Sequence, residues 1–394
     1  MRRGISLKMS TEGALRSHSN VGVRKLILIL HRWVGLVAAL VLPAIGVSAV
    51  LLIFERPVDR LLNGSLMKVA PTGPQLSLNE ITRRLIQAFP QYHVALWSLP
   101  QQPNDAAAVW LEINHGAKPG TLSEALELAV NPYTGEVMGD LEKANGLMRN
   151  VHQFHTHFLA GNIGSTIVGW SAVCLLILNL TGIVLWWRRK IGRFRWNATG
   201  TSFHFYAHQA VGIYAWTFFM VLSLTGIAIH WESEAGRLVN WLTGSPPPAK
   251  MLSAEPVQES TGPLDADQLI SIAKMNAPGA KVTTVYMAAT PQGPVRIVMK
   301  YPEDHTPAGR TQVFLDAYSG KVLMLTNTRS ASLGFKLIRL WNRQYHTGDI
   351  FGWPTQMPAL VFSLALVVMA ITGPMIWYKR KGTSPMVQAA AGEN

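Results

Sequence analysis

Charged side chains are scarce in this sequence. They make up 14% of its 394 residues, whereas a soluble domain carries about 25%. Cysteine is nearly absent as well: Cys174 is the only one, so no disulfide can form within the chain, and it reads as a small packing residue. The sequence also has no Gly-x-Gly-x-x-Gly after a strand, no Walker A sequence and no His-Glu-x-x-His. These absences argue against dinucleotide binding, ATP hydrolysis and zinc peptidase chemistry.

Long apolar runs take the place of the missing charge. Hydrophobic residues make up 48% of the chain, and about 20 apolar residues are enough to cross a bilayer. Four runs reach that length, at approximately 26–54, 163–187, 205–231 and 353–378. We therefore expect an α-helical membrane protein whose four transmembrane helices contact the lipid bilayer.

The net charge of +13 is concentrated beside these runs. Basic residues cluster before the first run, after the second and after the fourth, where only Glu12 and Glu393 oppose them. This distribution follows the positive-inside rule and does not indicate a nucleic-acid partner. It predicts a multi-pass membrane protein with both termini in the cytoplasm. The predicted order is a cytoplasmic N-terminus at 1–25, a span at 26–54, a periplasmic segment at 55–150, a span with a periplasmic lead-in at 151–187, a cytoplasmic loop at 188–204, a span at 205–231, a periplasmic segment at 232–345, a span with a periplasmic lead-in at 346–378 and a cytoplasmic tail at 379–394.

Four histidines occupy repeated positions in this arrangement. His31 and His208 each begin a His-x-x-x-Gly sequence and are each followed by a glutamate 24 residues later, with an offset of 208 − 31 = 177. His155 and His346 are each followed by Gly, Thr-Gly and Trp beginning 6, 26 and 31 residues later, with an offset of 346 − 155 = 191. Histidine in or beside a membrane span is rare and usually functional. The repeated frames predict an internal duplication that holds two opposed histidine pairs.

Each external segment predicts a small α+β module. In the first, Ser77 and Glu80 suggest a capping box at the start of a helix that runs to about residue 89. In the second, a helix is expected at 265–275. Both modules end in Tyr-Thr/Ser-Gly-x-Val, so we expect one helix against a small antiparallel sheet in each. The predicted strands are 92–99, 107–114 and 126–130 in the first module, and 282–288, 295–300 and 312–315 in the second.

This order of elements resembles the PepSY-associated transmembrane helix family of bacterial inner-membrane proteins. The resemblance covers about residues 24 to 381. It implies two PepSY-like modules and an oxidoreductase of the haem b type, because the family includes haem-containing reductases of ferric siderophores. The motifs that carry it are the His-x-x-x-Gly sequences at His31 and His208, His346-Thr347-Gly348 with Gly352 after it, the Thr-Gly pairs late in the second and fourth spans, and Tyr-Thr/Ser-Gly-x-Val in both modules.

On this resemblance, the four repeated histidines are the expected axial ligands of two haem b groups. Two halves with the same topology are expected to be related by a pseudo-two-fold axis along the membrane normal. His31 then faces His208 near the cytoplasmic side, and His155 faces His346 at the periplasmic boundary. Paired imidazoles suit six-coordinate haem iron, whose axial ligands set its potential.

Five further residues are predicted near these haem groups. Gly35 and Gly212 lie one turn after their histidines on the same helix face, where glycine would let a flat macrocycle approach the helix. His152, His204 and His230 are candidate substitutes or neighbours of the ligands, but they have no histidine at the repeated position in the other half.

The residues by themselves leave other functions open. The histidines could serve only as hydrogen-bonding groups between helices, and the dense run 152–157 could bind zinc or copper. A haem-free membrane protein that recognises a peptide or partner protein through its modules, and a metal-ion transporter, are the alternative functions. The leading prediction is a di-haem transmembrane electron-transfer protein. Electrons would come from an unidentified cytoplasmic or membrane donor, and a periplasmic ferric siderophore would accept them and release its iron as Fe(II).

Overall fold

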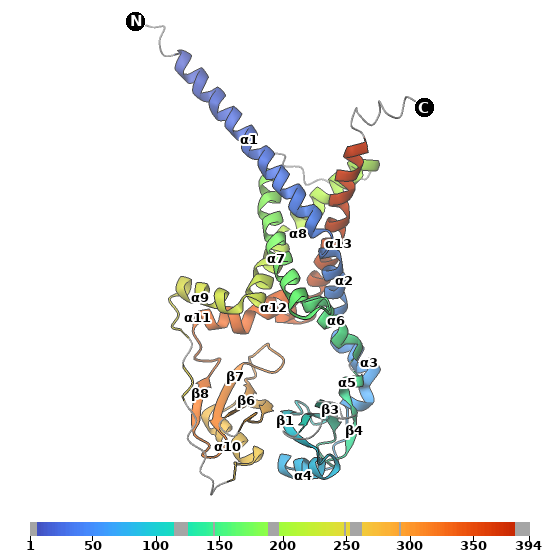
Figure 1. The fold of residues 1–394 in the computed structure, drawn as a ribbon, viewed down its shortest axis with the longest axis vertical. Helices are drawn as coiled ribbons and strands as arrows, with labels where there is room; N and C mark the ends of the chain where they lie inside the picture. The colour runs from blue at the N-terminus through green and yellow to red at the C-terminus, as the bar shows by residue number, and fades with distance from the viewer. Residues whose placement is uncertain are drawn as a thin grey trace.

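The computed structural model of this chain describes residues 6–113, 125–144, 146–187, 197–247, 250–252, 262–290 and 293–382. Most of the basic loop predicted at 188–204 and of the tail predicted at 379–394 lies outside these residues. Long helices form one end of the molecule and a β-sheet forms the other (Figure 1). The first and last helices point away from the sheet at their outer ends (Figure 1).

Three helices are long and apolar enough to cross a membrane, and a bent pair of helices makes a fourth span if it is counted as one. The three single helices are α7 (Gly161–Trp187), α8 (Gly200–His230) and α13 (Trp353–Gly382). The bent pair is α1 (Ser6–Ala38) and α2 (Leu42–Ile53), which meet at an angle of 58°. Helices long and apolar enough to cross a membrane therefore lie at three of the four predicted runs, and the bent pair lies at the first.

Proline explains the break in the first span. Pro43 lies in the first turn of α2 and has no N–H to continue the hydrogen bonding of α1. The backbone between the helices instead makes tight turns, in which Leu40 and Val41 donate to the carbonyls three residues before them. A proline in a membrane helix can be tolerated as a kink, whereas the length of the apolar run alone predicted a single span at 26–54.

The spans pack into one bundle. Helix α7 contacts α1 and α8, while α13 contacts α8 and α2. Small residues such as Ala38 and Ala215 are buried between them beside Phe219, so the helices approach closely. Short helices lead from the bundle toward the sheet. They are α3 (Glu55–Met67), α5 (Leu141–Ala144), α6 (Gly146–His157), α9 (Glu232–Thr243), α11 (Leu333–Phe335), the π-helix η1 (Lys336–Trp341), α12 (Asn342–Thr347) and the 3-10 helix η2 (Asp349–Phe351).

The sheet is continuous across both external segments. Its eight antiparallel strands have the order β4-β3-β2-β1-β5-β6-β7-β8. The central pair β1–β5 joins the segments, with Leu96 opposite Tyr286 and Ser98 opposite Thr284. The strands are β1 (Tyr92–Ser98), β2 (Ala107–Ile113), β3 (Ala125–Val130), β4 (Val137–Asp140), β5 (Lys281–Tyr286), β6 (Pro294–Lys300), β7 (Thr311–Asp316) and β8 (Val322–Thr326).

The joined sheet corrects the prediction of two separate small sheets. A module that ended at β1 or β5 would expose a row of unpaired backbone groups, which is a site for aggregation. Pairing the two first strands removes both of these edges. The predicted inner strands are present, and the sequence missed only the short outer strands β4 and β8.

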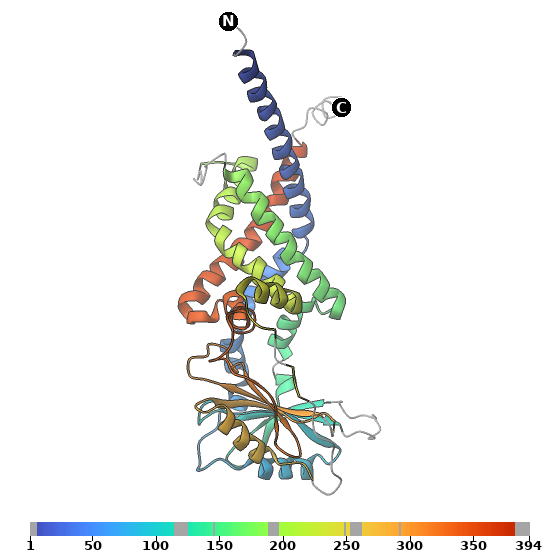
Figure 2. The same cartoon turned by 90° about the vertical axis from the view of Figure 1, so that its left-hand side faces the viewer.

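Two helices cover one face of the sheet. Helix α4 (Leu78–Ala88) and helix α10 (Ala266–Asn276) pack on the face turned away from the bundle (Figures 1 and 2). The Asp265 capping box is complete, whereas at Ser77 only the side-chain acceptor half forms, because Arg83 and Arg84 engage the Glu80 carboxylate. The opposite face of the sheet looks toward the membrane helices.

Candidate functional site

The structure brings His31 and His208 together. His31 lies on α1 and His208 on α8, and their ring centroids are 6.4 Å apart with the ring planes at 87°. Two imidazoles that bind one metal ion from opposite sides, at about 2.0 Å for each metal–nitrogen bond, have ring centres roughly 6 to 6.5 Å apart. The observed spacing therefore fits one metal ion between the two rings.

A threonine fixes each of these two rings. The His31 Nδ1 is 2.8 Å from Thr181 Oγ1, and the His208 Nδ1 is 2.9 Å from Thr372 Oγ1. Each threonine hydroxyl donates its only proton to a backbone carbonyl one turn before it, at 2.6 Å for Thr181 and 2.8 Å for Thr372. The hydroxyl oxygen must then accept from Nδ1–H, since it has no second proton to donate. Both rings are thus held as the tautomer whose Nε2 carries a lone pair.

The histidines of the second pair make the same kind of hydrogen bond to a hydroxyl group. His155 on α6 places its Nδ1 3.0 Å from Ser48 Oγ, and His346 on α12 places its Nδ1 2.9 Å from Thr225 Oγ1. The hydroxyl of Ser48 donates to the Ala44 carbonyl at 2.9 Å, and that of Thr225 donates to the Val221 carbonyl at 2.6 Å. These two rings are therefore also protonated at Nδ1.

The four Nε2 atoms remain available to a ligand. Among the described residues, no hydrogen bond occupies the Nε2 of any of the four histidines. Metal-binding histidines usually donate their other ring N–H to an oxygen, which orients the ring and raises its basicity. A hydroxyl at Nδ1 and a free Nε2 are thus typical of a histidine that binds a metal ion.

The protonation state of the second pair also suits metal binding. Burial lowers the pKa of His155 to about 4, and the charge of His152 lowers it further. Burial lowers the pKa of His346 to about 4, with smaller contributions from the nearby His155 and Arg343. Both rings are neutral at pH 7, and only a neutral imidazole offers a lone pair to a metal.

The hydroxyl partners repeat with the same offsets as the histidines. Thr225 follows Ser48 by 225 − 48 = 177, and Thr372 follows Thr181 by 372 − 181 = 191. Thr181 and Thr372 were recognised in the sequence only as repeated markers, and Ser48 and Thr225 were not predicted. Adding 177 to the residue number of each serine and threonine in the first span would have led from Ser48 to Thr225.

The two pairs lie at different depths in the bundle. Helix α8 carries both His208 of the first pair and Thr225 of the second, 225 − 208 = 17 residues apart. At 1.5 Å per residue, this separation is about 25 Å along the helix axis. His31 and His208 lie on the side of the bundle that carries the outer ends of α1 and α13. His155 and His346 lie on the side of the sheet.

Glycines lie against three of the four histidine rings, but these glycines are not the predicted Gly35 and Gly212. A Cβ atom at Gly182, Gly226 or Gly373 would be 3.5 Å from Cε1 of His31, His346 or His208, respectively. The predicted pair lies elsewhere: a Cβ at Gly35 would meet Leu178 at 3.5 Å, and one at Gly212 would meet Met369 at 3.0 Å. Gly35 and Gly212 therefore let neighbouring helices approach, and their contact with a macrocycle stays a prediction.

The remaining candidate histidines lie around the two pairs. His152 lines a small cavity together with Glu55, Asp59, Arg149 and Gln153. The other two candidates contact neighbouring helices instead. His204 Nε2 is 3.2 Å from Lys379 Nζ, and the His230 ring packs against Gly169 with its Nδ1 3.4 Å from Ser165 Oγ.

The zinc or copper alternative finds no ligand cluster. Within the residues that the structure describes, no group of three or more His, Cys, Asp or Glu side chains could hold a metal ion. In the run 152–157, the Nδ1 of His157 bonds to Thr156 Oγ1 at 2.7 Å, while His155 is bound to Ser48. Two opposed imidazoles instead suit an ion whose remaining ligands come from a macrocycle.

Comparison with known proteins gives one family. The sequence profile described as the PepSY-associated TM region matches residues 28–380, which include all four spans, both external segments and all four histidines. No curated protein matches the chain.

Proposed function

The chain belongs to the family of the PepSY-associated TM region, and on this premise we propose that it is a di-haem electron-transfer protein of the bacterial inner membrane that reduces a periplasmic ferric siderophore. His31 and His208 would hold one haem b, and His155 and His346 would hold the other. The single observation that carries this proposal is that all four histidines are oriented through Nδ1 by a hydroxyl and keep Nε2 free.

The residues of the chain have defined tasks in this proposal. When bound, each haem would supply a one-electron couple whose potential depends on its axial ligands and their hydrogen bonds. The four hydroxyl groups hold the imidazole rings at fixed angles, so no ring has to turn before it can act as a ligand. Small and apolar residues between the helices keep water away from the space between the two levels.

The direction of transfer follows from the arrangement of the chain. With the positive-inside orientation, the pair His31 and His208 lies on the cytoplasmic side and the sheet lies in the periplasm. A donor on the cytoplasmic or membrane side would supply one electron for each ferric ion. Reduction of Fe(III) to Fe(II) weakens its binding to hard oxygen donors, so the siderophore releases the iron. The repeated offsets indicate a duplication in which each half of the chain would supply one histidine to each of the two pairs.

An optical spectrum of detergent-purified protein from haem-sufficient cells tests this proposal. We expect Soret and α bands that sharpen and shift when dithionite is added. His31→Ala should remove one of two spectral components and His346→Ala the other, whereas the control His93→Ala on β1 should change neither. Protein that is folded and colourless would contradict the proposal and favour a haem-free binding protein.

Electron paramagnetic resonance gives a second test, which depends on ring geometry. The rings of His31 and His208 are close to perpendicular, at 87°. Perpendicular imidazole planes leave low-spin ferric haem with nearly degenerate orbitals, so its signal should be highly anisotropic. His31→Ala should abolish this component, and a signal typical of parallel rings would contradict the proposed pair.

A further inference from the structure

The open face of the sheet carries one row of residues in register. Across β3, β2, β1, β5, β6, β7 and β8, each member of the row lies opposite the next, and none is fully buried. The buried alternate positions, such as Val285 and Ile297, face the opposite way, toward α4 and α10. The row is Glu127, Trp110, Leu96, Tyr286, Arg296, Phe314 and Met324.

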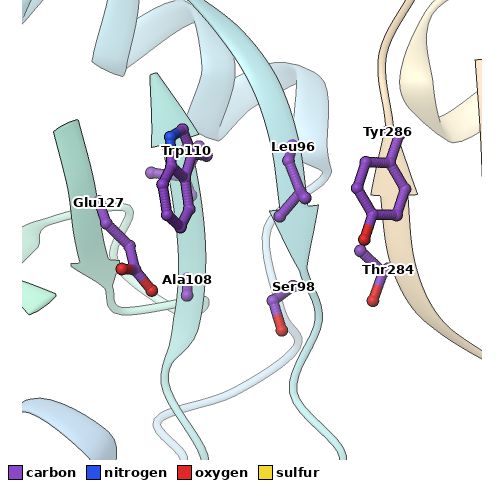
Figure 3. A pocket seen from close by; sticks show the side chains of 8 residues that line it. Leu96, Ser98, Ala108, Trp110, Glu127, Thr284 and Tyr286 are labelled. Carbon is purple, nitrogen blue, oxygen red and sulfur yellow. The ribbon is translucent and has the colours of Figure 1, made fainter. Parts of the chain in front are cut away.

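The middle of this row forms a shallow cavity. Figure 3 shows Trp110 on β2 and Tyr286 on β5 on either side of Leu96, with Glu127 at one edge. The cavity has a volume of about 230 Å³, which is less than the roughly 300 to 1,000 Å³ of a site that encloses a drug-sized ligand. A larger ligand would therefore rest on this surface and need a second wall.

Two contacts join this side of the sheet to the short helices that lead toward the bundle. Arg149 of α6 forms an ion pair with Glu127 and lies over the Trp110 ring, 6.0 Å from its centroid. At the other side, the loop between β6 and β7 brings His305 to 6.3 Å from the ring centroid of Phe351 in η2. The open face and the helix ends thus lie opposite each other.

Arginines gather on the β5–β8 side of this space. Arg296 lies over the ring of Tyr286, with its Cζ 3.7 Å from the ring centroid. Arg310, at the end of the loop between β6 and β7, lies within electrostatic range of Arg339 in η1 and Arg343 in α12. We call Arg310, Arg339 and Arg343 the arginine cluster, and Tyr286, which lies under Arg296, is also within electrostatic range of Arg310.

The charge of the arginine cluster is not balanced. Glu232 is the carboxylate within range of Arg310, and it already forms an ion pair with Arg339. Partial burial lowers the pKa of Arg310, Arg343 lowers it further, and Glu232 and Tyr286 oppose this effect in part. No hydrogen bond or ion pair joins the Arg310 guanidinium to another described residue. Guanidinium groups left together and partly out of water are costly unless an anion joins them.

The arginine cluster adjoins the second histidine pair. Arg343 precedes His346 by one helical turn, and its charge acts on that ring. The π-helix η1 lies directly before α12, and such wide turns often occur at functional sites because they redirect the side chains that follow. An anion bound by the cluster would lie between the sheet and the pair His155 and His346.

We propose that the arginine cluster is the binding site for the anionic oxygen donors of a negatively charged ferric chelate, with Tyr286 of the open face beside it. This inference rests on the proposed function, since it assigns the charge class of the acceptor. Guanidinium groups bind carboxylate and similar oxygens through two parallel hydrogen bonds. A neutral chelate would leave the cationic charges unpaired and should bind more weakly.

Gallium(III) chelates test the site without electron transfer, because gallium resembles ferric iron but is not reduced. The full-length protein in detergent would be dialysed against anionic gallium citrate or neutral gallium tris(acetohydroxamate), and bound gallium would be measured by mass spectrometry. We expect the citrate complex to bind about tenfold more tightly than the neutral chelate at low salt, and this preference should fall as salt is added. Equal binding of both chelates, or binding of neither, would overturn the proposal.

Variants locate the site. Arg310→Gln should weaken binding of gallium citrate by about tenfold and leave the neutral chelate within about twofold. Arg310→Lys should restore part of the loss because it keeps the charge. Arg237→Gln on α9 is a control with the same loss of charge, since Arg237 is exposed and paired only with Glu234 among the residues described.

Haem propionates are the competing source of carboxylate for these arginines, and the same variants distinguish them. If Arg310→Gln and Arg343→Gln lower the haem content but leave gallium citrate binding unchanged, the arginines hold propionates and the chelate site is wrong. The proposed function is tested separately. If the purified protein contained no haem but still preferred gallium citrate, the anion-binding site would stand and only the electron-transfer function would be wrong.

Discussion

At the residue scale, each of the four repeated histidines bonds through Nδ1 to a hydroxyl group on another helix. His31, His155, His208 and His346 each donate from Nδ1 to a serine or threonine whose own proton is already engaged by the backbone. His204 instead lies beside Lys379, whose side chain approaches its Nε2. His157 also bonds through Nδ1 to a hydroxyl group, but its partner is the adjacent Thr156, so the four pairs are distinguished by a bond between helices at repeated positions.

Removing a hydroxyl partner gives the first prediction. Thr181→Val keeps the side-chain volume but leaves the His31 Nδ1–H without an acceptor, which costs about 1 to 3 kcal/mol in apolar surroundings. Loss of such an oriented partner usually weakens metal binding by about 10 to 100-fold. We expect Thr181→Val to lose the haem of the first pair during purification, as measured by absorbance at the Soret band, and Thr181→Ser to keep it.

Thr225→Val supplies the matched comparison, since Thr225 serves His346 in the second pair. Each valine variant should affect one spectral component and spare the other. If both variants retain the wild-type spectrum and potential, the hydroxyl groups do not orient ligands.

The sequence predicted the histidines of this site but not their setting. His31, His155, His208 and His346 were found because a repeat exposes positions that composition hides. Ser48 and Thr225 were missed because a hydroxyl in a membrane helix usually bonds to its own backbone, as these also do. Their second contact, with a ring on another helix, depends on packing that one sequence does not contain.

At the element scale, the contact between α2 and α13 positions Ser48. Gly46 lies two residues before it on α2, and a Cβ atom there would be 2.9 Å from Val367 Cγ2 and 3.2 Å from the Ser363 carbonyl oxygen on α13. The absence of a side chain at Gly46 therefore sets how closely the two helices approach, and this distance places the Ser48 hydroxyl against His155.

A larger side chain at this contact gives the second prediction. Gly46→Leu should push α2 away from α13, at a cost of about 1 to 3 kcal/mol from overpacking. We expect a lower thermal midpoint in detergent and loss of the spectral component assigned to His155 and His346, with the other component retained. Gly22→Leu on α1 is the control, because nothing lies within 4 Å of an added Cβ there. If Gly46→Leu and Gly22→Leu gave the same spectrum, the approach of α2 to α13 would not determine whether His155 and His346 hold a haem.

Elements were predicted well where a long pattern defines them. The apolar runs gave the spans, and alternating residues gave the inner strands. The break before Pro43 and the outer strands β4 and β8 were not predicted, because the first depends on one residue and the strands are only 4 and 5 residues long. The pairing of β1 with β5 joins positions about 190 residues apart, which local periodicity cannot reveal.

At the scale of the whole molecule, the two external segments share one core. Trp97 of β1 is 1% exposed and belongs to the same buried cluster as Leu269 of α10 and Val285 of β5. Across the segments, the Asp267 carboxylate of α10 accepts hydrogen bonds from the backbone N–H groups of Leu78 and Asn79 at the start of α4. The sheet should therefore behave as one cooperative unit.

This cooperativity gives the third prediction. Trp97→Ala removes a fully buried ring and should cost about 3 to 5 kcal/mol. Amide hydrogen exchange, measured by mass spectrometry on the full-length protein, should then increase in β5–β8 as well as in β1–β4. Faster exchange confined to β1–β4 would mean that the two segments are separate domains that only touch.

The number of haem groups per chain tests the central claim most directly. Pyridine haemochrome absorbance, divided by protein concentration from amino-acid analysis, should give two haem b per chain for the wild-type protein and one for either double variant, His31→Ala/His208→Ala or His155→Ala/His346→Ala. A wild-type value near zero, or a value that neither double variant changes, would contradict the assignment of these histidines as haem ligands.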